Sequence, residues 1–348
     1  MKPLTLDKVA SVTYNLGLDR EVRVSEEFPC QAGDVVAVRV KNSKSTYNVL
    51  ELPTGRFSSL KPGDVVAGAL GHRRALQGYA GVVPDSLAVG DTVHLLNMGG
   101  VIGHCTSASA EVGPPFECEV LGQVLEFPYL GKRQGEPANI GRHVGSLDGK
   151  LDDGLAPVLA IVGTCMNSGK TQACTNLIQE FTRRRKRVAG CKVTGVSLRR
   201  DVLGMADAGA HPVMSFTDLG VVTSSRATAP AVTTTLLNRL NRENPDLIVV
   251  ELGDGLMGDY GVDAILEDQA LRNCFRALVL AASDPVGAWG GAEIIRSTYG
   301  CELTAITGPC TDNAAGSEAV NRSTGVPALN ARFEFSALAD LVLEAVGA

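Results

Sequence analysis

The chain has 348 residues, of which 45% are hydrophobic and 20% charged, a length that suits about two domains. Its net charge of −6 argues against a general nucleic-acid binder, which would carry a basic surface. No apolar run approaches the roughly 20 residues of a membrane span, and the N-terminal residues lack the apolar core of a signal peptide. Nine cysteines without a CxxC pair, in a chain with no export signal, predict reduced thiols and a cytoplasmic protein. The charge and the hydropathy together predict neither nucleic-acid nor membrane partners.

Residues 1–127 have the pattern of β structure, with apolar and polar residues alternating in short runs. A Gly-Asp pair precedes three of these runs, at Gly33-Asp34, Gly63-Asp64 and Gly90-Asp91. Gly-Asp is a turn signal, and strand-forming residues follow each pair. The pattern predicts a small all-β domain, either a barrel or a sandwich.

Residues 128–155 contain many glycines and little periodic apolar pattern, which is typical of a linker. From residue 156 to residue 348, buried strands alternate with amphipathic helices. This alternation predicts an α/β domain with a mainly parallel sheet flanked by helices. The expected strands are 157–162, 188–193, 246–251, 276–281 and 302–307, and the clearest helices are 170–185 and 336–346.

A glycine-containing loop, GTCMNSGKT, joins the first of these strands to its helix. Backbone N–H groups of such a loop wrap phosphates, and a lysine in the position of Lys170 reaches the β- and γ-phosphate oxygens. The hydroxyl of Thr171 is expected to coordinate magnesium. The sequence therefore predicts a P-loop NTPase domain whose nucleotide-binding residues are Gly163, Thr164, Cys165, Met166, Asn167, Ser168, Gly169, Lys170 and Thr171.

Two more candidates follow later strands. Glu251 ends an apolar run and precedes a glycine-rich loop, where a carboxylate can provide a second magnesium contact. Asn313, after the last expected strand, is a candidate for contact with the base or, alternatively, a helix cap. The Asn-Lys-x-Asp signature typical of GTPases is absent, so ATP is the expected nucleotide.

The spacing of five residues between Gly163 and Gly169-Lys170 resembles that of dethiobiotin synthetase. Gly190-Cys191-Lys192 is similar to the Gly-x-Lys-Pro of that family, although Val193 replaces the proline. Glu251 begins a Glu-x-Gly-x-Gly stretch like the family's Glu-Gly-Ala-Gly-Gly. The resemblance covers roughly residues 156–346, and the N-terminal β domain has no counterpart in dethiobiotin synthetase.

This resemblance implies further roles for residues of the second domain. Lys192 would contact substrate and act with Lys170 in catalysis, and Asp207 would bind magnesium together with Thr171 and Glu251. Asp201 or Asp218 could take the place of Asp207. The resemblance also implies a possible homodimer.

The function expected from these residues is an ATP- and Mg²⁺-dependent ligase. It would activate a small carboxylate or carbamate by phosphoryl transfer and then join it to an amine. One alternative is a nucleotide-dependent switch or a metal-centre assembly factor with Cys165, Cys174 and Cys191 as ligands. Another is an amino-acid N-acyltransferase-like enzyme. The long polar segment 201–226 is expected to form a substrate lid.

Overall fold

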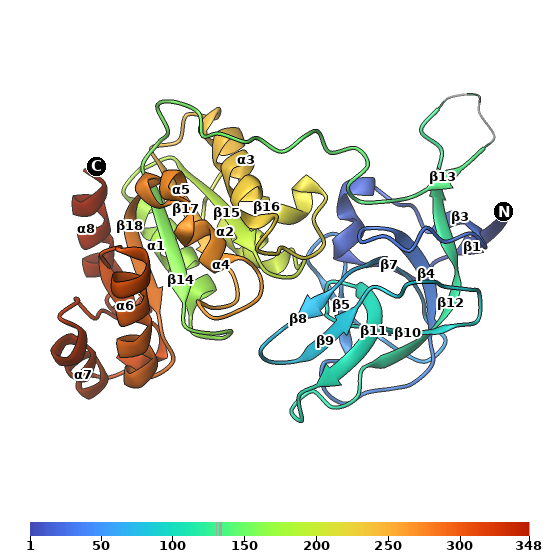
Figure 1. Ribbon diagram of the computed structural model, residues 1–348, viewed down its shortest axis with the longest axis horizontal. Coiled ribbons are helices and arrows are strands. Elements are labelled where there is room, and N and C mark those ends of the chain that lie inside the picture. Colours follow the sequence, from blue (N-terminus) through green and yellow to red (C-terminus); the bar gives the residue numbers. More distant parts are fainter. Residues whose placement is uncertain (130, 132–133, 348) are drawn as a thin grey trace. The chain divides into compact units, whose positions relative to one another are not determined.

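The computed structural model describes residues 1–129, 131 and 134–347, which form two compact units (Figure 1). The first, here called the β unit, comprises Met1–Gly145 with the two short segments Val196–Arg200 and Thr217–Thr223. The second, here called the α/β unit, comprises Ser146–Gly195, Asp201–Phe216 and Ser224–Ala348. None of the helices in the described ranges has both the length and the apolar character needed to cross a membrane.

The β unit consists of short strands and one 3₁₀ helix, η1 (Ser11–Leu16). Its strands are β1 (Lys2–Thr5), β2 (Lys8–Val9), β3 (Glu21–Ser25), β4 (Val35–Val40), β5 (Val49–Glu51), β6 (Phe57–Ser59), β7 (Val65–Leu70), β8 (Arg73–Arg74), β9 (Tyr79–Val82), β10 (Thr92–Leu95), β11 (Val101–Ala108), β12 (Phe116–Glu126) and β13 (Glu136–Pro137).

Five of these strands close into a barrel. β12 pairs with β4, β4 with β7, β7 with β11, β11 with β10, and β10 returns to β12. All of these pairs are antiparallel except β7 with β11. Closure leaves these strands without an open edge. The sequence pattern was compatible with either a barrel or a sandwich, and the strand pairing shows that this part of the unit is a barrel.

The three Gly-Asp pairs form turns of the same geometry in front of β4, β7 and β10. In each turn the aspartate carboxylate accepts a hydrogen bond from the backbone N–H three residues earlier, at 2.7–2.8 Å. The backbone N–H of the same aspartate donates to the carbonyl of that earlier residue at 3.1 Å. The glycines have φ between 93° and 96°, a region that favours glycine. The prediction that these pairs precede strands is confirmed.

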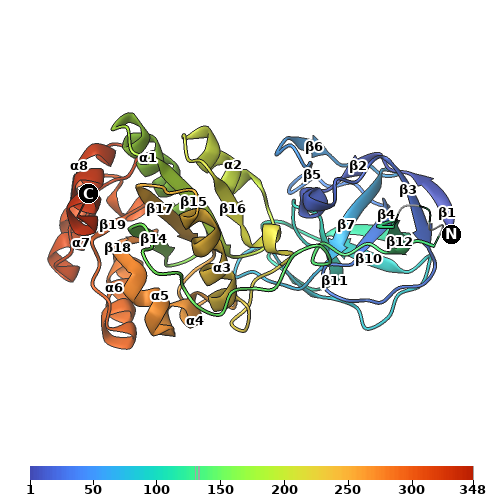
Figure 2. The same ribbon diagram turned by 90° about the horizontal axis from the view of Figure 1, so that it is seen from above.

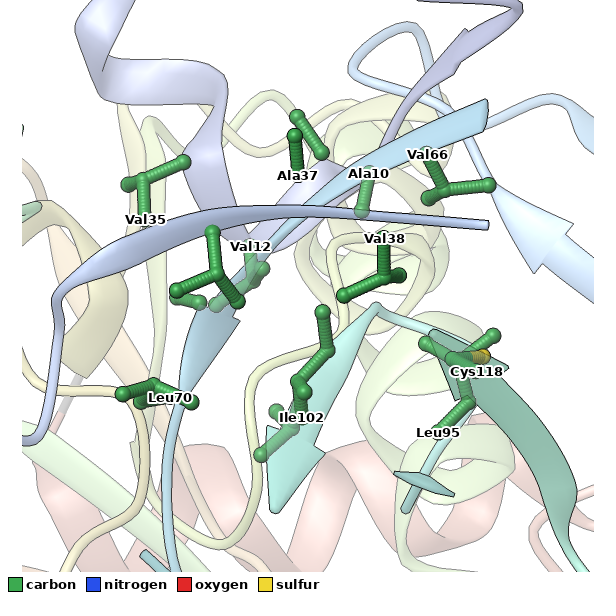
Figure 3. Packing of buried hydrophobic residues seen from close by; sticks show 14 of the residues in the cluster. Ala10, Val12, Val35, Ala37, Val38, Val66, Leu70, Leu95, Ile102 and Cys118 are labelled. Atoms are coloured by element: carbon green, nitrogen blue, oxygen red, sulfur yellow. The ribbon is translucent and has the colours of Figure 1, made fainter. Parts of the chain in front are cut away.

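Aliphatic side chains from the barrel strands fill its interior (Figure 3). Val35 and Val38 of β4, Val66 of β7 and Ile102 of β11 are fully buried in this core. The four successive residues 35–38 of β4 are all buried, so both faces of this strand are covered. The buried core fixes the barrel on which the rest of the unit is built.

Residues 128–155 were expected to be a linker, but part of this stretch belongs to the β unit. β13 pairs with β12, and Ala138 and Ile140 are fully buried in the core of the β unit. The chain therefore remains in the β unit up to Gly145. Residues 130, 132 and 133 of this stretch lie outside the described residues.

The α/β unit contains one sheet and its covering helices. The strands are β14 (Val158–Gly163), β15 (Val188–Thr194), β16 (Val213–Ser215), β17 (Leu247–Leu252), β18 (Phe275–Ala281) and β19 (Ala305–Thr307). The helices are α1 (Lys170–Arg183), α2 (Arg200–Asp207), α3 (Ala229–Asn241), α4 (Val262–Glu267), α5 (Gln269–Cys274), α6 (Pro285–Tyr299), α7 (Ala314–Thr324) and α8 (Phe335–Val346), with 3₁₀ turns η2 (Phe216–Leu219) and η3 (Pro309–Thr311).

The strands run in the order β16-β15-β17-β14-β18-β19, and all their pairings are parallel. Figure 2 shows α1, α2 and α8 on one face of the sheet and α3 to α6 on the other. The apolar side of α1, with Leu177 and Phe181, packs with Leu338 and Val342 of α8 against β14, β17 and β18. This arrangement confirms the predicted α/β domain with a parallel sheet flanked by helices.

Two neighbouring glycines on α6 give a test of how tightly that helix packs. A Cβ at Gly291 would stand 2.9 Å from Cδ2 of Leu280 and 3.1 Å from Cγ2 of Thr164, whereas a Cβ at Gly290 would meet nothing within 4 Å. We expect Gly290→Ala to raise the free energy of unfolding by about 0.5–1 kcal/mol, because alanine is the better helix former. Gly291→Ala should lower it by about 1–3 kcal/mol through overpacking. Thermal unfolding of both variants measures this, and a stabilised Gly291→Ala would contradict the packing.

Candidate functional site

The phosphate-binding loop predicted from the sequence lies between β14 and α1. β14 ends at Gly163, and α1 begins at Lys170 with Gly169 as its N-cap residue. The side chain of Lys170 folds back over the start of the loop, so that a Cβ at Gly163 would stand 2.8 Å from Nζ. A side chain at position 163 would therefore displace the hydroxyl of Ser168 or the end of the Lys170 side chain.

Lys170 is 6% exposed, and its ammonium group is held by backbone oxygens of two loops. Nζ donates to the carbonyl oxygen of Cys165 at 2.8 Å and, over a short distance, to that of Asp254. Burial lowers the pKa of Lys170, while the nearby carboxylate of Glu251 opposes this shift. A cation that is shielded from water in this way interacts strongly with an incoming anion.

Glu251 joins the loop to two further charged groups. It is the fifth residue of β17, is 2% exposed, and accepts a hydrogen bond at Oε1 from the hydroxyl of Thr171 at 3.1 Å. Nζ of Lys192, on β15, lies 3.7 Å from the same oxygen and forms a short ion pair with Asp201 of α2. Burial raises the pKa of the Glu251 carboxyl, and Lys192 opposes the shift. Thr171, Lys192, Asp201 and Glu251 thus form one largely buried cluster beside Lys170.

The loop that follows β17 packs directly on the phosphate-binding loop. The backbone N–H of Leu256 donates to the carbonyl oxygen of Gly163 at 2.9 Å. A Cβ at Gly255 would stand 2.7 Å from the carbonyl oxygen of Thr164. The glycine-rich sequence after Glu251 therefore allows two backbones to meet beside the lysine, which is the position that parallel α/β sheets use for ligands.

The cluster provides oxygen ligands that suit magnesium. Oε2 of Glu251 is buried and has no hydrogen-bond partner among the described residues. Together with the Thr171 hydroxyl it offers the hard oxygen donors that Mg²⁺ prefers, and Mg²⁺ usually takes only one or two carboxylates besides phosphate and water. Among the described residues, no group of three or more His, Cys, Asp or Glu side chains could hold a metal ion.

Three residues predicted for the site lie elsewhere or have another role. Asp207 is exposed at the last residue of α2, and Asp201, at the start of that helix, is the acid that reaches Lys192. Asp218 belongs to the β unit, where it accepts a hydrogen bond from the hydroxyl of Tyr14. Asn313 is exposed, and its side-chain oxygen accepts a hydrogen bond from the backbone N–H of Gly316 at 2.9 Å. It therefore caps α7, which was the alternative to a contact with the base.

The segment expected to form a lid, residues 201–226, is largely built into the two units. It contains α2, β16 and η2, and residues 217–223 belong to the β unit. Arg226 forms exposed ion pairs with Asp263 and Glu267. These contacts give the segment a structural role in place of the predicted lid.

The other residues of the phosphate-binding loop, which lie around Lys170, have uncharged side chains. Ser168 is buried with its hydroxyl 3.4 Å from Lys170 Nζ, and Met166 is partly buried. Asn167 is exposed, with a φ of 61°. The Sγ atom of Cys165 lies 3.3 Å from the hydroxyl of Ser283, at the start of the segment that leads into α6. This segment after β18 is thus part of the wall of the site.

Comparisons with known proteins give partial structural likenesses. No protein-family model and no curated protein matches the chain. Among solved structures, it is similar to the signal recognition particle 54 kDa protein from Aeropyrum pernix in complex with GDP (19% identity, TM-score 0.36). It is also similar to the signal recognition particle receptor FtsY from Elizabethkingia anophelis in complex with GDP (14%, 0.40) and to a DUF1611 family protein from Anabaena variabilis (17%, 0.38).

Each of these matches covers 60% of the chain. They cover 52%, 68% and 64% of the three solved chains, so that the chain spans about half the length of the first of them. The likeness concerns the fold alone.

Proposed function

We propose that the α/β unit binds ATP with magnesium at residues 163–171 and works as a ligase-type enzyme on a small carboxylate or carbamate. The observation that carries this proposal is the placement of two lysines, the buried Lys170 and the partly buried Lys192, around the Thr171–Glu251 pair. Two cations and a metal-binding pair in one largely buried cluster suit the transfer of a highly charged phosphoryl group.

The proposed chemistry has two steps. A carboxylate oxygen of the substrate attacks the γ-phosphorus of ATP, which forms an acyl phosphate and releases ADP. The nitrogen of an amine then attacks the acyl carbon, a C–N bond forms, and inorganic phosphate leaves. In both steps the chain contributes position and positive charge rather than a covalent intermediate.

The residues of the cluster have separate roles in this scheme. Lys170 would hold the phosphates through its ammonium group, and Lys192 would exchange part of its pairing with Asp201 for the anionic acceptor. Thr171 and Glu251 would hold Mg²⁺, which supplies charge neutralisation on the phosphates when bound. ATP is proposed over GTP because the sequence lacks the Asn-Lys-x-Asp signature.

The alternative of a metal-centre assembly factor receives no support from the cysteines. Cys174 and Cys191 are fully buried in the α/β unit, and burial raises the pKa of both thiols well above the usual range. Thiolate is the form that binds metals, so these two side chains suit a core role.

The proposal predicts that phosphate release depends on an acid substrate. The protein is incubated with Mg²⁺, ATP and a pool of metabolite carboxylic acids, with and without amines, and inorganic phosphate is measured. We expect a rise of at least about tenfold with the acids. Hydroxylamine, which reacts with acyl phosphates, should yield a hydroxamate only when ATP and the acid are both present. Phosphate release that is indifferent to every acid, with no hydroxamate, would exclude the ligase chemistry.

A further inference from the structure

Phe333 is a large aromatic residue on the surface of the α/β unit. It lies in the segment between α7 and α8, and it is 71% exposed. Contact of an aromatic ring with water is unfavourable, and aromatic residues in proteins bury most of their surface. A single exposed apolar residue is nevertheless common, so the role of Phe333 depends on what lies next to it.

The direction of a bound nucleotide follows from the position of Lys170. Its ammonium group lies at the carbonyl oxygens of Cys165 and Asp254, so the β- and γ-phosphates are expected at this end of the loop. The loop then leads to Gly169 at the start of α1, where backbone N–H groups receive the phosphate nearest the sugar. The sugar and the base therefore leave the loop on the side of Gly169.

The residues that follow β19 pack on this side of the loop. A Cβ at Gly169 would stand 3.2 Å from Cα of Gly308 and 3.5 Å from Cδ of Pro309. These two residues come directly after the last residue of β19. A nucleoside that leaves the loop at this point therefore meets the part of the α/β unit that begins where β19 ends.

The turn that carries Phe333 is attached to the same region. Ala328 forms a parallel bridge with Ile306 of β19. Because parallel strands end at the same edge of a sheet, the turn after this bridge lies at the edge that carries the phosphate-binding loop. The side-chain amide of Asn176, in the second turn of α1, donates to the carbonyl oxygen of Ala331 at 2.8 Å. The turn thus lies beside the first turns of α1.

Hydrogen bonds hold this turn in place. Asn330 is 3% exposed, and its Nδ2 atom donates to the carbonyl oxygen of Thr311 at 3.0 Å and to the carboxylate of Asp312 at 2.9 Å. The backbone N–H of Phe333 donates to the carbonyl oxygen of Asn330 at 3.3 Å. A side chain on a fixed turn loses little further freedom when a ligand covers it, which favours binding.

We propose that the ring of Phe333 stacks on the base of the bound nucleotide. Stacking of a base on an aromatic side chain covers the apolar faces of both rings and does not require a hydrogen-bond pattern. The inference rests on the proposed binding of ATP at residues 163–171, and it adds the residue that holds the adenine ring. Asn313, the candidate for this role in the sequence, is the cap of α7.

Calorimetric titration of the full chain with ATP and with inorganic tripolyphosphate, both in the presence of Mg²⁺, tests this role. Phe333→Ala should weaken ATP binding at least about fivefold, because the stacking partner is lost. It should leave the affinity for tripolyphosphate unchanged, since this ligand has no base. Phe333→Tyr keeps the ring and should bind ATP as the native chain does. Phe127→Ala, at an aromatic position of the β unit that is 42% exposed, is the matched control and should also titrate like the native chain.

An affinity of Phe333→Ala for ATP equal to the native value would overturn the stacking, and so would an equal loss of affinity for tripolyphosphate. A native chain that binds no ATP would overturn both the stacking and the proposed function. ATP binding that depends on Phe333, in a protein whose phosphate release is indifferent to every acid, would support the stacking and exclude only the ligase chemistry.

Discussion

Replacing Lys170 by alanine should weaken ATP binding by roughly 100-fold or more. The ammonium is expected to make at least two charge-assisted hydrogen bonds to phosphate, each contributing about 1.5–3 kcal/mol. Their loss corresponds to a decrease in affinity of roughly 100-fold or more. In the nucleotide-free chain the buried ammonium is held by two carbonyl oxygens and lies near the carboxylate of Glu251. The affinity is therefore compared only after circular dichroism shows that the variant is folded.

The sole tryptophan of the chain offers a direct readout of this change. Trp289 lies on α6 and is 53% exposed, and a Cβ at Gly291 of the same helix would stand 3.1 Å from Cγ2 of Thr164 in the loop. Nucleotide binding to the native chain should therefore alter the fluorescence of Trp289. Lys150→Ala, an exposed lysine of the same unit, serves as the control and should titrate like the native chain. An affinity of Lys170→Ala within about tenfold of the native value would refute the assigned role of the lysine.

Replacing Glu51 by alanine is expected to destabilise the β unit by about 3–5 kcal/mol. This residue ends β5, is fully buried, and accepts hydrogen bonds from the backbone N–H groups of Arg199 at 2.7 Å and Arg200 at 2.6 Å. The hydroxyl of Ser11 donates to the same carboxylate. Removal of the carboxylate leaves the buried hydroxyl of Ser11 and two partly buried backbone N–H groups without these bonds, which is a costly kind of substitution.

Thermal unfolding followed by circular dichroism measures this effect. For a unit of this size, the expected loss corresponds to a fall in Tm of about 8 °C or more. Glu21→Ala is the matched control, since Glu21 is exposed on β3 and accepts one hydrogen bond, from Thr5 at 2.8 Å. A native-like Tm for Glu51→Ala would show that Arg199 and Arg200 do not depend on this carboxylate.

The parts of the fold that were predictable from sequence depend on local signals. The Gly-Asp turns, the apolar strand before Gly163 and the helix after Gly169 are each specified within about ten residues of chain. The same holds for Lys170, Thr171 and Glu251, which lie at strand ends or helix starts that their neighbours define.

The parts that were missed depend on contacts between distant residues. Asp201 and Asp207 stand at opposite ends of one helix, and only the position of that helix decides which carboxylate reaches Lys192. Glu51 lies in a short strand of ordinary sequence, so nothing near it indicates an interaction with Arg199. The inclusion of residues 196–200 and 217–223 in the β unit has the same origin.

The discontinuous β unit has a consequence for the order in which the chain can fold during synthesis. Its Glu51–Arg199 contact joins residues 148 positions apart, and its last segment ends at Thr223. At about 5–20 residues per second, the ribosome needs roughly 4–16 s to add the residues between Gly145 and Thr223. During this interval the barrel strands are complete, but the carboxylate of Glu51 lacks its backbone donors. The unit that is synthesised first can therefore reach its final structure only after much of the second has been made.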